Sequence, residues 1–144
     1  MDAPRALYCG NLDNALAQLR RSLAYLRSPA AADAGLYEQF RAACVQAFEF
    51  TYELAVRHIR RQLSEASASP GVADLPFADQ MRLAQAAGLV RDQAAFRQYR
   101  ALRNLTSHTY EEANADLIVA ELELFVADVD WLLGALTRAG WHRA

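Results

Sequence analysis

Lysine is absent from this chain, so all fifteen of its basic side chains are arginines. The formal net charge is -2, and no overall excess of positive charge indicates a nucleic-acid-binding protein. Any anion that a side-chain cation binds must therefore be held by an arginine or a histidine.

Cysteine is also scarce. Cys9 and Cys44 are the two cysteines, and neither belongs to a Cys-x-x-Cys pair or to a cluster with zinc-ligand spacing. We expect two reduced thiols in a cytoplasmic protein. The sequence also has no Gly-rich phosphate loop and no Ser triad signature, which leaves the commonest nucleotide-binding and hydrolase motifs without support.

Long uncharged apolar runs are missing too. The first residues lack the apolar segment of a signal peptide. The most apolar stretch, residues 117–136, carries four carboxylates, Glu121, Glu123, Asp128 and Asp130. Such a density of charge excludes a membrane span, so we expect no membrane association.

Alternating strand patterns are absent, whereas apolar residues recur at helical spacing through most of the chain. The 144 residues, 53% of them hydrophobic, suit a single domain over 1–144. Three long helices and two shorter ones are predicted, forming an all-α antiparallel up-and-down bundle. Their expected ranges are 12–26, 36–64, 76–88, 92–105 and 111–139, with connections at 30–35 and 64–75.

Several residues mark where these helices begin and end. Asn11 is expected to cap the first helix and Asp92 the fourth. Pro76 suits the first turn of the third helix, and Gly88 and Gly140 suit the ends of the third and fifth.

The second helix carries more aromatic residues than one apolar stripe can bury. Phe50 and Tyr52 are expected to point away from the Phe48 face, which implies burial on more than one side. A second subunit or another helix of the same chain can supply that cover, and we favour a homodimer. Nearby, Arg57, Arg60 and Arg61 form a short basic patch of the kind that is usually only solvated.

The most unusual segment is residues 100–110, where polar groups suited to phosphate chemistry crowd together. These are Arg103, Asn104, Ser107, His108 and Tyr110. Thr109 and Glu112 have capping-box spacing, which predicts that a new helix starts there and that the chain breaks between Arg103 and His108. Tyr110 then lies in the first turn of the last helix.

An arginine can bind a phosphate and stabilise the charge that builds on phosphorus during cleavage. A histidine with an ordinary pKa near ~6.5 can move protons at cellular pH. With RNA, the substrate's own 2′-hydroxyl can serve as the nucleophile, and no metal is then required. From the residues alone, a structural role for this cluster remains the commoner alternative.

The pattern Arg103-x4-His108-x-Tyr110 resembles that of the HEPN superfamily, in particular its HepT-like toxins. The longer strings 103–110 and 48–55, together with Ala-Ala-Gly-Leu-Val at 86–90, are similar to the nucleotidyltransferase substrate-binding proteins of that superfamily. The similarity covers about residues 10–138.

This resemblance implies a homodimeric helical bundle with the motif in a cleft at the dimer interface. Arg103 and His108 are then the catalytic residues of a metal-independent endoribonuclease, with Asn104, Ser107 and Glu53 in support. Tyr110 is the residue that a cognate small nucleotidyltransferase of the MNT type modifies with AMP, using its own ATP and Mg²⁺. The alternative that the resemblance also offers is a non-catalytic subunit that binds a substrate or nucleotide for the transferase.

Overall fold

The computed structural model describes residues 7–66 and 70–144. Residues 1–6 and the middle of the expected 64–75 connection lie outside the described part. Within it, the chain forms only helices and one isolated bridge between Tyr8 and His142. The α-helices are α1 (Gly10–Leu26), α2 (Ala34–Ala66), α3 (Phe77–Ala86), α4 (Gln93–Leu105), α5 (Glu112–Ala120) and α6 (Leu122–Arg138), with 3-10 turns η1 (Pro29–Ala32), η2 (Pro70–Asp74) and η3 (Thr106–His108).

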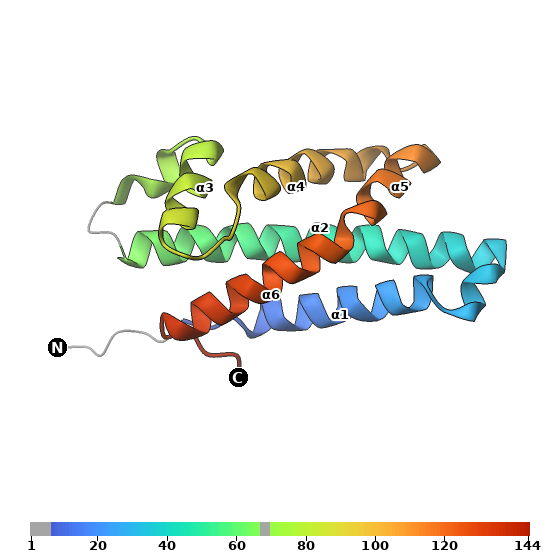
Figure 1. Cartoon of the computed structure of the whole chain (residues 1–144), viewed down its shortest axis with the longest axis horizontal. Helices are drawn as coiled ribbons and strands as arrows, with labels where there is room; N and C mark the ends of the chain where they lie inside the picture. The colour runs from blue at the N-terminus through green and yellow to red at the C-terminus, as the bar shows by residue number, and fades with distance from the viewer. Residues whose placement is uncertain (1–6, 67–69) are drawn as a thin grey trace.

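Helix α2 is the axis of the fold. It has 33 residues and runs the length of the molecule, with α1 antiparallel on one side and α4 antiparallel on the other (Figure 1). Helix α6 contacts both α1 and α2. Helix α3 packs against the C-terminal end of α2 and the N-terminal end of α4 (Figure 1). The expected all-α bundle is therefore confirmed.

The chemistry of most helix ends agrees with the sequence. The Asp92 carboxylate accepts a hydrogen bond from the Ala94 amide at 2.9 Å, as expected for an N-cap. Gly88 and Gly140 have φ of 77° and 104°, and each follows the last turn of a helix. The amide of Leu89 reaches the Ala84 carbonyl at 2.9 Å, which closes the end of α3.

The prediction for Asn11 is wrong. The helix begins two residues earlier than expected, with Cys9 in the N-cap position and no side chain capping it. The cause lies in the terminal segments, because the Cys9 amide donates to the His142 carbonyl at 2.9 Å. This pairing with the C-terminal residues fixes the path of the chain into α1.

The single last helix expected over 111–139 is also wrong, because the chain bends at Glu121. The Glu121 amide bonds the Ile118 carbonyl at 3.1 Å, a tight i to i−3 closure that ends α5 and lets α6 start in a new direction. The apolar spacing of Ile118, Leu122 and Phe125 runs through the bend unbroken, and all three are fully buried. The described residues thus hold six α-helices instead of the expected five.

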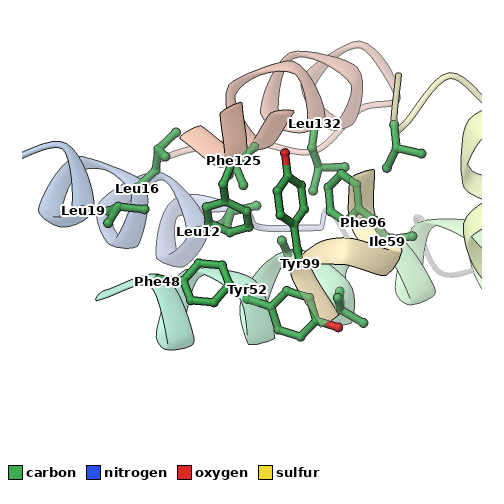
Figure 2. Packing of buried hydrophobic residues seen from close by; sticks show 14 of the residues in the cluster. Leu12, Leu16, Leu19, Phe48, Tyr52, Ile59, Phe96, Tyr99, Phe125 and Leu132 are labelled. Atoms are coloured by element: carbon green, nitrogen blue, oxygen red, sulfur yellow. The ribbon is translucent and has the colours of Figure 1, made fainter. Parts of the chain in front are cut away.

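Aromatic rings from three helices meet in the core. The Phe125 ring centroid lies 4.8 Å from that of Phe48 and 4.9 Å from that of Tyr99, both in edge-to-face geometry (Figure 2). Tyr52 is buried in this chain as well, with only 7% of its surface exposed. For Tyr52, the cover therefore comes from the same chain, which is the alternative that the sequence analysis did not favour, whereas Phe50 remains 62% exposed.

Cys9 and Cys44 are buried and unpaired, in agreement with the sequence. Burial raises the pKa of the Cys44 thiol to about 11, which keeps it protonated. No helix in the described ranges has both the length and the apolar character needed to cross a membrane.

Candidate functional site

Arg103 lies in the last turn of α4, facing α2. Its Nε and Nη2 atoms both donate to Oε1 of Glu53, at 3.2 and 2.6 Å. Nη2 also lies 3.1 Å from the carboxylate of Glu49, one helical turn away from Glu53 on α2. Nη1 donates to the hydroxyl of Thr106 at 3.0 Å. The guanidinium is thus held in one orientation by two helices and the turn that follows α4.

These contacts raise the pKa of Arg103 above its ordinary value. The largest cause is the hydrogen bond that Arg103 donates to Glu53; burial lowers the pKa, and the charge of Glu49 raises it further. Arg103 is therefore a fixed cation at any cellular pH. About 29% of its side chain is exposed, so an incoming anion can still reach it.

The chain leaves α4 through the 3-10 turn Thr106–His108, which confirms the predicted break between Arg103 and His108. The predicted capping box is wrong. Thr109 follows this turn directly, and its hydroxyl bonds the Thr106 carbonyl at 3.5 Å instead of an amide of the next helix. Helix α5 starts at Glu112, with Glu111 in the N-cap position and no side chain capping it.

Tyr110 accordingly lies in the turn before α5, not in the first turn of the helix. The phenol is 80% exposed, the most open position among the large apolar and aromatic residues of the described chain. The His108 ring is also exposed and lies 6.1 Å from the Tyr110 ring, measured between centroids. The amide of Asn114 donates to the His108 carbonyl at 2.9 Å and ties the turn to α5.

The structure therefore brings the predicted residues together in two groups. Arg103 is joined to Glu53, and His108 lies beside Tyr110. No hydrogen bond or ion pair links Arg103 to His108 within residues 7–66 and 70–144. Asn104 and Ser107 are exposed between the two groups, and the Ser107 hydroxyl bonds the Asn104 carbonyl at 3.4 Å.

Two open grooves border the site. One, of about 520 Å³, lies between α1 and α2 and includes the exposed Phe50 beside Glu53. The other, of about 250 Å³, runs along the start of α2 past Glu49, Thr106 and Thr109. Access to the site from solvent is thus possible along α2 in both directions.

Sequence analysis missed Glu49 and Asn114. Glu49 could have been found, because it stands four residues before Glu53 and shares its helix face. Asn114 acts on the His108 backbone, and no local pattern announces such a contact. Among the residues with described positions, no group of three or more His, Cys, Asp or Glu side chains has the arrangement of a metal site.

Comparison with known proteins finds a family, a curated relative and a solved structure that are similar to this chain. A family model described as nucleotidyltransferase substrate binding protein like matches residues 8–138. A curated Haemophilus influenzae protein named probable ribonuclease HepT is 35% identical over 96 residues. The aligned part covers 66% of this chain and 66% of that relative, just under two thirds of its length. A solved Haemophilus influenzae structure, described as revealing the fold of a substrate binding domain of a nucleotidyltransferase, superposes with a TM-score of 0.82 at 29% identity, covering 88% of this chain and 96% of that chain.

Proposed function

Because the chain belongs to the nucleotidyltransferase substrate binding protein-like family and is similar to a probable HepT ribonuclease, we propose that it is the toxin of a toxin–antitoxin pair. In this proposal it cuts RNA without a metal ion, and a partner nucleotidyltransferase silences it. The observation that carries the proposal is the exposed turn after α4. This turn presents an imidazole and a phenol to solvent directly after an arginine that two carboxylates hold in place.

Cleavage requires one bond to phosphorus to form and one to break. The 2′-oxygen of the RNA attacks the adjacent phosphorus, His108 takes the 2′-hydroxyl proton, and the 5′-oxygen leaves with a proton from water. The products are a 2′,3′-cyclic phosphate and a free 5′-hydroxyl. Arg103 stabilises the extra negative charge on the phosphoryl oxygens, in a position that Glu53 and Glu49 have already fixed.

Silencing uses the phenol of Tyr110. Its oxygen attacks the α-phosphorus of ATP held by the partner, pyrophosphate leaves, and a base of the partner takes the phenolic proton. Mg²⁺ bound by the partner would stabilise the leaving group. The exposure of Tyr110 suits this step, because the partner must enclose the side chain. The added AMP places a phosphate beside His108 and excludes an RNA phosphate from the same surface.

A homodimer completes the proposal. Phe50 is largely exposed and lines the groove that also contains Glu53, the partner of Arg103. A second subunit packed on Phe50 would remove an exposed aromatic ring from water and turn the open surface beside Arg103 into a cleft.

The alternative is a non-catalytic subunit that binds a substrate or nucleotide for the transferase. One observation favours it: Arg103 already has two carboxylate partners and forms no hydrogen bond or ion pair with His108 in the described chain. A site of this kind can bind a phosphate by exchanging a carboxylate for it without any proton transfer.

Tyr110→Phe separates the proposed mechanism from the alternative. We expect cells that express this variant alone to stop growing, as with the parent, and we expect co-expression of the partner to rescue only the parent. Intact mass should show added AMP on the parent and none on Tyr110→Phe. Tyr25→Phe, at another exposed tyrosine, is the control and should be modified like the parent. A modified and silenced Tyr110→Phe protein would place the target at another residue.

A further inference from the structure

A third groove, of about 460 Å³, opens between α2, α3 and α4 next to Arg103. Arg57 and Arg60 of α2 and Arg100 of α4 line it, above Tyr52 and Phe77. The basic run of α2 noted in the sequence therefore divides in space. Arg57 and Arg60 face the groove, whereas Arg61 pairs with Glu65 at 3.0 Å on the exposed side of the same helix.

Among the residues with described positions, no carboxylate forms an ion pair with the three arginines of this groove, and Glu53, which also lines it, is paired with Arg103. Arg57 forms no hydrogen bond or ion pair with any residue whose position is described. Arg60 donates to the neutral amide oxygen of Gln80 at 2.9 Å. The Arg100 guanidinium lies 4.6 Å from the centroid of the Phe77 ring. A chain with a formal net charge of -2 thus concentrates unneutralised positive charge in one groove.

The pKa of Tyr52 also responds to the positive charge of these arginines. Burial raises the pKa of its phenol to about 12, against the opposing effect of Arg100, Arg60 and Arg103 in that order. The phenol therefore stays protonated and remains a hydrogen-bond donor. A neutral donor surrounded by guanidinium groups suits an anionic ligand.

The groove continues directly from the candidate site. Glu53 lines it and is bonded to Arg103. Because α2 and α4 are antiparallel, Arg57 and Arg60 on one helix and Arg100 on the other lie in the same direction from that bond. At about 1.5 Å of rise per residue, Arg60 lies roughly 10 Å from Glu53 along α2. That distance corresponds to about three nucleotides of a stacked strand, at roughly 3.4 Å each.

We propose that this groove holds the phosphate backbone of single-stranded RNA on one side of the bond that Arg103 and His108 cut. The inference rests on the proposed ribonuclease function and adds where the substrate lies. Arginines without carboxylate partners are suited to track a backbone without reading its sequence.

The test is binding of a short, fluorescently labelled 2′-O-methyl oligouridylate, which lacks the nucleophile and cannot be cut. Anisotropy is measured over a series of salt concentrations for the parent and for Arg57→Gln and Arg100→Gln. Each variant should bind roughly tenfold more weakly. Each should also lower the slope of log affinity against log salt by about 0.7, the value for one lost phosphate contact with a single strand.

Arg61→Gln is the matched control, since it removes an equal charge from the same helix outside the groove. Its affinity should stay within about twofold of the parent. Equal losses in Arg61→Gln and the groove variants, or no loss in any of them, would overturn the inference. So would groove variants that lose affinity for ATP while keeping it for the oligonucleotide. All three arginines are exposed, and matching circular dichroism melts would show that the fold is retained.

A dinucleotide substrate distinguishes failure of this inference from failure of the proposed function. Its single phosphate lies at Arg103 and leaves the groove empty, so Arg57→Gln should cut it at the parental rate. A parent that cuts it, with groove variants that bind the oligonucleotide normally, would refute the groove alone. A parent that binds the oligonucleotide through the groove but cuts nothing would refute the ribonuclease and keep the groove.

Discussion

Replacing Arg103 by Ala should separate activity from stability. The substitution removes ion pairs of 2.6 and 3.1 Å to Glu53 and Glu49, whose side chains are 48% and 39% exposed. Pairs with that degree of exposure contribute about 0.2–1 kcal/mol each. The hydrogen bond to Thr106 contributes about 1 kcal/mol more. The free energy of unfolding should therefore fall by about 1.4–3 kcal/mol, which lowers the Tm by roughly 4–12 °C.

The loss in catalysis should be far larger. Removing a fixed group that stabilises transition-state charge costs about 10²–10³ in kcat. Urea titration and cleavage of a labelled RNA by the same preparation measure both effects. Arg97→Ala, an exposed arginine earlier on α4, is the control and should change neither. A collapse of the fold would show Arg103 to be a structural residue. An unchanged cleavage rate would refute its role in the chemistry.

Two further predictions concern the assembly and its dependence on pH. Light scattering at micromolar concentration should give the mass of a dimer, and Phe50→Glu should give a folded monomer because a charge replaces the exposed ring. A monomeric parent of normal stability would contradict the composite cleft. Burial, and to a lesser degree Arg57, lowers the pKa of His58. Its Nε2 has no hydrogen-bond partner among the described residues, and its ring centroid lies 5.0 Å from that of Trp141. As the pH falls, His58 is protonated in the unfolded chain at a higher pH than in the folded chain. The free energy of unfolding should therefore keep its full value above pH ~6.5 and decline between that pH and the pKa of the folded chain, by at most about 1.4 kcal/mol per pH unit. Urea titrations between pH 5 and 8 should show a flatter profile for His58→Phe, and an identical profile in both proteins would assign the decline to other groups.

Local chemistry explains which parts of the fold the sequence could predict. Asp92 caps a helix within its own turn, and Gly88 and Gly140 adopt positive φ where a helix must end. Such signals need no knowledge of the rest of the chain. The bend at Glu121 gave no signal, because the apolar spacing on both sides of it is the spacing of one continuous helix.

The site shows the same limit. The break after Arg103 was predictable, but the capping box from which it was predicted is wrong. The Thr109 hydroxyl donates to the carbonyl of Thr106, three residues earlier, and caps no helix. Glu53 was expected to support the site from the family pattern. Its direct bond to Arg103 joins residues fifty positions apart, and only the packing of α2 against α4 creates it. The cover of Tyr52 by its own chain likewise depends on that packing.

Cleavage of RNA by the purified chain in the presence of EDTA tests the central claim most directly. The parent should cut a labelled RNA and leave a 2′,3′-cyclic phosphate, His108→Ala should be at least about 10²-fold slower, and His142→Ala, at an exposed histidine near the C-terminus, should match the parent. Cleavage that persists in His108→Ala, or a folded parent that cuts no RNA, would contradict the account.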